Sequence, residues 1–125
     1  MILGLGTDIV ENGRIAAAYR KRGERFLSRV YTPEEIEYSL SHADPIPYLA
    51  ARFAVKEAAI KALNIAGASA ISLKDVETSG RIFGKKKLAL QGRAREIADS
   101  MGVRRLHLSM SHTKSMSMAA VILED

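Results

Sequence analysis

Apolar and polar residues alternate near both ends of the chain, which is typical of strands. In residues 2–10, one face carries Ile2, Gly4, Gly6, Asp8 and Val10. Two glycines in line with an acid predict that another backbone or a ligand comes close to this strand. Residues 106–112 and 115–124 alternate in the same way, and the few residues between them predict an antiparallel hairpin.

Between these strands the apolar positions follow helical spacing. The predicted helices span 11–22, 48–63 and 91–101, and another begins at Thr32. Thr32, Pro33 and Glu35 form a helix start, with a capping threonine, a proline at the first position and a glutamate that completes a capping box.

Proline and glycine mark where the other elements begin and end. We expect Pro45 and Pro47 to break the chain before the long helix, and Gly102 to close the last one. Strands at 71–78 and 87–90 complete the order β-α-α-α-β-β-α-β-β. Its hairpins predict an α+β fold, with an antiparallel sheet packed against the long helix.

The length of 125 residues predicts a single domain, residues 1–125. The chain has no cysteine, which excludes disulfides, thiolate metal sites and cysteine nucleophiles. No apolar run approaches membrane-spanning length, and the start lacks the basic region of a signal peptide. We therefore expect a cytoplasmic protein that does not bind membranes.

The net charge of +5 indicates anionic partners. Nucleic acid is one candidate, but aromatic residues make up only 6% of the chain and no basic segment is interleaved with them. A phosphorylated cofactor together with an acidic protein partner would use the same charges. We therefore expect a phosphorylated cofactor and an acidic protein partner, and no nucleic acid.

The segment 52–63 carries the most informative chemistry. Glu57 and Lys61 lie four positions apart and share one face of the predicted helix. An exposed ion pair on the surface would explain these two residues alone. With Asp8 on a neighbouring strand, two carboxylates from two elements, flanked by a lysine, can hold a divalent cation and a phosphate together.

Three segments resemble those of the holo-acyl-carrier-protein synthases, which are 4′-phosphopantetheinyl transferases. The segments are Gly4-Leu5-Gly6-Thr7-Asp8-Ile9-Val10-Glu11 with Arg14-Ile15, Arg52-Phe53-Ala54-Val55-Lys56-Glu57-Ala58 through Lys61-Ala62-Leu63, and Leu108-Ser109-Met110-Ser111-His112-Thr113 with 119–124. The resemblance implies that the chain moves the phosphopantetheine arm of coenzyme A onto a serine of acyl carrier protein, in support of fatty acid biosynthesis.

The resemblance also implies roles for single residues. It gives Asp8 and Glu57 as ligands of a magnesium ion, with Lys61 contacting the same phosphates. Either Glu57 or a metal-bound water would take the proton from the serine hydroxyl. Arg52, His112 and Thr113 match positions that contact the nucleotide part of coenzyme A.

The partners implied by the resemblance are an acidic carrier protein and two further copies of the chain. Carrier protein would dock on the basic first helix, where Arg14 matches the family and Lys21, Arg22 and Arg25 would assist. A homotrimer would place each active site at a subunit interface, with His112 supplied by a neighbour. Two loops, at 64–67 and 84–86, depart from the family pattern at regions that contact coenzyme A.

Two other functions stay open on the sequence alone. A nucleic-acid-binding module would explain the charge but not Asp8, Glu57 or the closing hairpin, and its affinity would fall steeply with salt. A catalytically silent relative would keep the core pattern and lose the acids, whereas this chain has both.

Overall fold

The computed structural model describes residues 1–63, 71–80 and 86–125. In chain order its elements are β1 (Ile2–Glu11), α1 (Asn12–Arg22), α2 (Glu24–Val30), α3 (Pro33–Leu40), α4 (Ile46–Ala62), a 3₁₀ turn (Leu73–Asp75), β2 (Val76–Ser79), β3 (Lys87–Leu90), α5 (Gly92–Met101), β4 (Arg105–His112) and β5 (Met116–Glu124). The predicted α+β class is confirmed. Of the two loops that depart from the family pattern, residues 64–67 and 84–85 lie outside the described residues.

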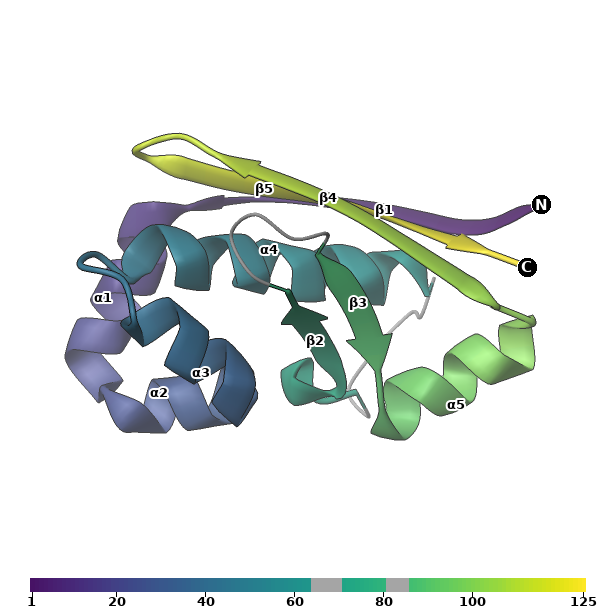
Figure 1. The fold of residues 1–125 in the computed structure, drawn as a ribbon, viewed down its shortest axis with the longest axis horizontal. Helices are drawn as coiled ribbons and strands as arrows, with labels where there is room; N and C mark the ends of the chain where they lie inside the picture. The colour runs from purple at the N-terminus through teal and green to yellow at the C-terminus, as the bar shows by residue number, and fades with distance from the viewer. Residues whose placement is uncertain (64–70, 81–85) are drawn as a thin grey trace.

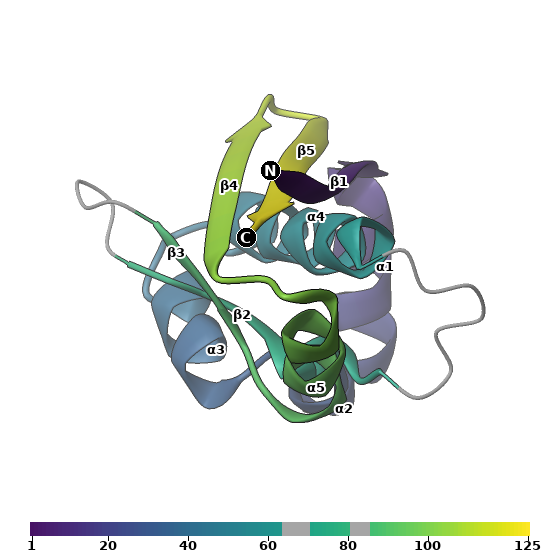
Figure 2. The same cartoon turned by 90° about the vertical axis from the view of Figure 1, so that its right-hand side faces the viewer.

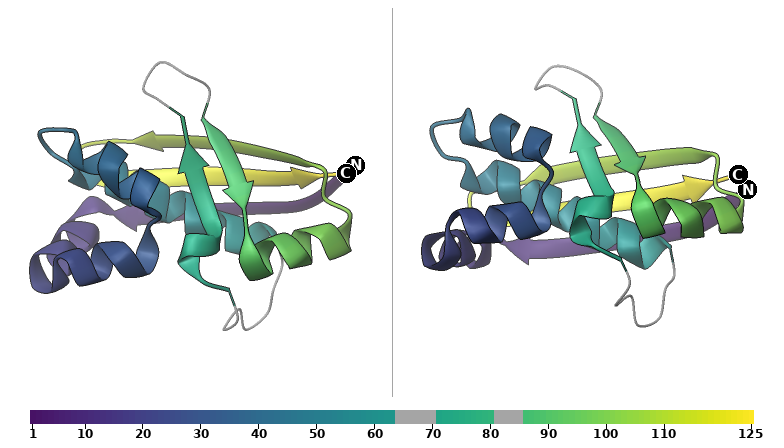
Figure 3. Two further views of the ribbon diagram at one scale, coloured as in Figure 1. Left: turned by 60° about the horizontal axis from the view of Figure 1, so that its bottom comes forward. Right: turned by 90° about the horizontal axis from the view of Figure 1, so that it is seen from below.

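Helix α4 forms the middle of the structure (Figure 1). A three-stranded antiparallel sheet in the order β1-β5-β4 covers one side of it. The two-stranded sheet β2-β3 lies with α2, α3 and α5 on the other side, as Figures 2 and 3 show. The antiparallel sheet on a long helix is therefore present as predicted.

The small residues of β1 and α4 let the two elements lie in direct contact. A Cβ atom added at Gly6 would lie 1.9 Å from the carbonyl oxygen of Ala58, and one at Gly4 would lie 2.0 Å from that of Ala62. Only glycine leaves room for such an approach. The close neighbour predicted from these glycines is therefore the backbone of α4, and the contact holds Asp8 beside this helix.

The core continues from this contact through both layers. Leu49, Ala54, Val55 and Ala58 on α4 are buried, as are Val121 and other alternate residues of β5. Burying these apolar side chains is the main stabilising contribution to the fold. No helix within the described ranges combines the length and apolarity that a membrane span requires.

Three local predictions need correction. Helix α4 begins at Ile46 and not at Tyr48, because a first-turn residue needs no intrahelical N–H bond and Pro47 fits there. Helix α2 was not predicted, since its 7 residues are too few to show helical spacing. The strand predicted at 71–78 starts as a 3₁₀ turn, in which the Ser72 hydroxyl accepts from Lys74 N–H.

Candidate active site

Strand β1 and helix α4 bring three of the predicted site residues together. The Lys61 ammonium donates to Asp8 Oδ1 at 3.0 Å and to the carbonyl oxygen of Thr7 at 3.0 Å. Glu57 lies one helical turn before Lys61 on α4. The alternative of a plain Glu57–Lys61 surface pair does not hold in this structure, because the lysine pairs with the strand carboxylate instead.

The electrostatics of this cluster favour a further cation. Partial burial and the negative charge of Asp8 raise the pKa of Glu57, and Lys61 only partly opposes this rise. The positive charge that the chain places near Glu57 is thus too small to offset the cost of its negative charge. A divalent cation between the two carboxylates would relieve this repulsion.

The residues present fit a magnesium ion. Magnesium takes few protein carboxylates and completes its shell with waters and substrate phosphates. Asp8 and Glu57 supply two carboxylates from two elements, and Asp8 is largely shielded, with 17% of its side chain exposed. The described part of the chain holds no group of three or more His, Cys, Asp and Glu side chains suited to a metal. A site with two carboxylates is consistent with the positions of Asp8 and Glu57 and with the lack of a larger ligand group among the described residues.

His112 and Thr113 lie on the other edge of the sheet. Asp8 is paired with Ala119 of β5, and β5 in turn pairs its Ser117 with His112 of β4. Within one chain, a whole strand therefore separates His112 from Asp8. Thr113 begins the β4–β5 turn, where its hydroxyl accepts from the N–H of Met116 at 3.0 Å.

Arg52 is enclosed by the chain and incompletely bonded. Only 2% of it is exposed, and its guanidinium carbon lies 4.2 Å from the centre of the Tyr38 ring. Burial lowers the pKa of Arg52, and the charge of Glu35 opposes this effect. Among the described residues, Arg52 Nε has no hydrogen-bond partner.

Tyr38 belongs to an aromatic and cationic cluster that the sequence analysis missed. Lys86 Nζ lies 4.7 Å from the Tyr38 ring centre and bonds the Tyr38 hydroxyl at 3.3 Å. His42 stacks on Tyr48 with ring centres 3.5 Å apart, and Tyr48 lies 6.3 Å from the ring of His112. The spacing of four between Tyr38 and His42 was the signal that could have found part of this cluster.

The predicted carrier-protein residues are all exposed and lie on α1 and α2: Arg14, Lys21, Arg22 and Arg25. Arg22 and Arg25 also line a surface hollow of about 280 Å³ together with Arg29. Arg29 is a basic residue of this surface that the sequence analysis did not single out. The three guanidinium groups concentrate positive charge beside α1.

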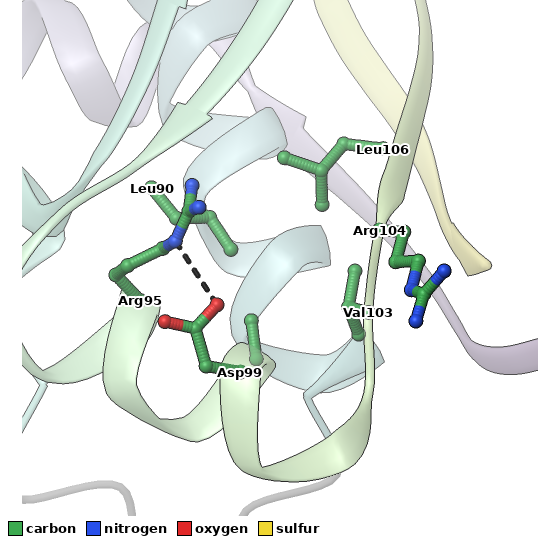
Figure 4. A pocket seen from close by; sticks show the side chains of 7 residues that line it. Leu90, Arg95, Asp99, Val103, Arg104 and Leu106 are labelled. Carbon is green, nitrogen blue, oxygen red and sulfur yellow. Dashed lines mark hydrogen bonds and ion pairs between the residues drawn. The ribbon is translucent and has the colours of Figure 1, made fainter. Parts of the chain in front are cut away.

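A second hollow of about 280 Å³ lies between β3, α5 and β4 (Figure 4). Its lining residues are Leu90, Arg95, Ala98, Asp99, Val103, Arg104 and Leu106. Arg95 Nε donates to Asp99 Oδ1 at 3.1 Å, so these two charges at the hollow are already paired. None of the residues predicted for the site lines it.

Comparisons with known proteins agree on one family. The family model described as the 4′-phosphopantetheinyl transferase superfamily matches residues 4–117. The holo-[acyl-carrier-protein] synthase of Koribacter versatilis is 46% identical over 125 residues and covers 100% of both chains. That of Leptospira biflexa is 43% identical over 121 residues, covering 97% of this chain and 95% of the relative.

Solved structures are similar over the same length. The crystal structure of the holo-[acyl-carrier-protein] synthase from Neisseria meningitidis has a TM-score of 0.87 and 36% identity, covering 100% of both chains. The Helicobacter pylori synthase, solved in complex with coenzyme A, has a TM-score of 0.81 and 28% identity, covering 96% of this chain and 99% of that one.

Proposed function

The chain belongs to the 4′-phosphopantetheinyl transferase superfamily, as a member of the holo-[acyl-carrier-protein] synthases, and from this membership we propose a magnesium-dependent transfer at Asp8 and Glu57. As a synthase of this family, it transfers phosphopantetheine from coenzyme A to apo-acyl carrier protein. The observation that supports the site is the convergence of Asp8, Glu57 and Lys61 at the contact between β1 and α4.

The proposed reaction is an attack by the carrier serine on the pyrophosphate of coenzyme A. The serine oxygen forms a bond to the phosphorus next to pantetheine. The bond from that phosphorus to the bridging oxygen breaks, and adenosine 3′,5′-bisphosphate leaves with the electron pair. Charge develops on the phosphate oxygens, so fixed positive charge beside them accelerates the step.

Each residue of the cluster has a task in this reaction. Asp8 and Glu57 would hold the magnesium ion, which would supply positive charge beside the pyrophosphate. Lys61 exchanges its bond with Asp8 for one with a phosphate oxygen. Glu57, a carboxylate one helical turn before Lys61, would receive the serine proton.

We propose that the nucleotide end of coenzyme A lies against Arg52, His112 and Thr113. Arg52 and Lys86 place two cations around the Tyr38 ring, and Arg52 Nε has a free donor among the described residues. Phosphate oxygens accept such charge-assisted bonds. The cluster around Tyr38 therefore supports an anionic group at this end of α4.

We propose that three copies of this single-domain chain assemble and share their sites. The outer face of the three-stranded sheet exposes apolar residues, with Leu5 at 63%, Ile9 at 64% and Met118 at 46% exposed. An apolar face of this kind is typical of a surface that a partner covers. His112 is a strand away from Asp8 in its own chain, so a neighbour's His112 is the one that completes the cleft.

Carrier protein would dock on the basic surface of α1 and α2 in this proposal. Its acidic residues complement Arg14, Lys21, Arg22 and Arg25, which steer the encounter. Modified carrier protein then serves fatty acid biosynthesis, in the cytoplasm.

Intact mass spectrometry of apo-carrier protein tests the function. With coenzyme A and magnesium, the carrier gains the mass of one phosphopantetheine. Chelation of the magnesium prevents the gain, and a carrier whose acceptor serine is replaced by alanine is the matched control. An unmodified carrier under all conditions would refute the proposed function.

A further inference from the structure

A buried ion pair lies on a different face of α4 from the acid cluster. The Lys56 ammonium is 2.7 Å from Glu35 Oε1, and neither side chain has any exposed surface. Lys56 also donates to the carbonyl oxygens of Leu73, at 3.0 Å, and of Val76. All three ammonium protons therefore have acceptors.

Glu35 is equally well bonded. Its Oε1 accepts from the N–H of Thr32 at 3.0 Å, as the predicted capping box requires, and its Oε2 accepts from the N–H of Thr78 at 3.0 Å. The pair thus joins the start of α3, the middle of α4 and strand β2. Each carboxylate oxygen of Glu35 and each ammonium proton of Lys56 takes part in a directed hydrogen bond.

Such a pair contributes more to geometry than to stability. Removing two charges from water is costly, and buried ion pairs can often be replaced by apolar residues with no loss of stability. What apolar contacts lack is direction. Five directed bonds, from three different segments, fix how α4 is rotated about its own axis and how far it slides along it.

We propose that the Lys56–Glu35 pair is a positioning device that sets the direction of the Glu57 carboxylate toward Asp8. Lys56 and Glu57 are adjacent on α4, so about 100° of helix rotation separates their side chains. Because α4 is a rigid helix, fixing the direction of Lys56 also fixes the direction in which Glu57 leaves the helix. This inference rests on the proposed role of Glu57 in holding magnesium.

The test removes both charges together, in the double variant Lys56→Met with Glu35→Gln. Glutamine can still accept from the N–H of Thr32, so the capping box is kept. No buried charge is left alone, but the carbonyls of Leu73 and Val76 and the N–H of Thr78 lose their partners, so we expect a folded variant with a lower melting temperature than the wild type. We expect kcat to fall on the order of 10-fold to 100-fold, because misplacing a reacting group by about 1 Å has effects of this size.

Two further readouts separate positioning from stability. Binding of Mn²⁺ in the absence of substrates, measured by electron paramagnetic resonance of the free ion, should weaken in the double variant. The KM for carrier protein should stay unchanged, since α1 and α2 are untouched. The matched control is Val55→Ala, a buried change on the same helix that lowers stability but leaves the ion pair intact. It should keep the wild-type kcat and Mn²⁺ affinity.

The outcomes distinguish this inference from the proposed function. Wild-type protein that transfers nothing and binds no Mn²⁺ would refute the function itself. Active wild-type protein with a folded double variant of unchanged kcat and Mn²⁺ affinity would overturn the positioning role. If the double variant does not fold, Lys56→Gln with Glu35→Gln, which also leaves no buried charge alone, is measured in the same way. Failure of that variant to fold would also overturn the inference, because the pair would then serve folding and not the placement of Glu57.

Discussion

The contact between Gly6 and α4 can be tested by adding one methyl group. In Gly6→Ala, the new Cβ would lie 1.9 Å from the carbonyl oxygen of Ala58, and 2.7 Å from the backbone N of Ala62. Heavy atoms of non-neighbouring residues essentially never lie within 3.0 Å of a Cβ. Because both clashing groups are backbone of α4, no side chain can rotate away.

The size of the effect follows from this distance. Strand β1 must move away from α4 by about 1 Å, since packed interiors leave no free space for the methyl group. Overpacking of this kind destabilises a protein by roughly 1–3 kcal/mol. Asp8 lies two residues further on the same face of β1, so it moves away from Glu57 by a similar distance. Transferase activity should therefore fall on the order of 100-fold.

Urea unfolding followed by circular dichroism, together with initial rates of carrier modification, measures both effects. The matched control is Gly13→Ala, because nothing lies within 4 Å of a Cβ at this helical position. The control should be as stable as the wild type or more stable by up to about 1 kcal/mol, since alanine is the better helix former. Wild-type stability and activity in Gly6→Ala would refute the close packing of β1 on α4.

Four further predictions concern the site and its partners. Asp8→Asn and Glu57→Gln should each abolish most transferase activity while circular dichroism shows an unchanged fold; near-normal turnover at saturating magnesium would contradict the metal site. Because the pKa of Glu57 is raised in the native state, that state binds the proton more tightly than the unfolded chain, and its stability falls as pH rises from the ordinary carboxyl pKa through the raised one. Without magnesium at neutral pH, Glu57→Gln should thus unfold at a higher urea concentration than the wild type; a lower midpoint would contradict the raised pKa of Glu57. Reversing the charges of Arg14 and Arg22 should raise the KM for carrier protein and flatten its salt dependence, with the KM for coenzyme A as the control that stays constant. Mixing inactive Glu57→Gln and His112→Ala proteins after mild dissociation should restore part of the activity, whereas full activity from a monomer in light scattering would exclude shared sites.

The sequence predicted the elements that carry strong local signals. The alternation of β1, β4 and β5 depends on burial of one face, and this pattern is visible without a structure. The capping box at Thr32 and Glu35 is also local, and both of its bonds are present. For the same reason Asp8, Glu57 and Lys61 could be selected as candidates.

Contacts between distant segments could not be predicted in this way. Lys61 pairs with Asp8 and not with its helical neighbour Glu57, because β1 lies directly on α4. The second role of Glu35, with Lys56 and Thr78, depends on how α3, α4 and β2 pack together. The burial of Arg52 against Tyr38 likewise arises from tertiary packing that no sequence spacing shows.

The order of strands in the sheet has a consequence for how the protein is made. Among the strands that the structure describes, β1 pairs with β5 alone, and the Ser117 hydroxyl donates to Asn12 Oδ1 across 105 positions of the chain. During synthesis, β1 emerges before β5 and, among the described strands, finds no partner until β5 has been translated. Its unpaired edge and its apolar outer face, including Leu5 and Ile9, are exposed in the nascent chain for that whole time. Pairings between such distant segments form slowly. We therefore expect the pairing of β1 with β5 to limit the rate at which Asp8 comes to lie beside Glu57 and Lys61.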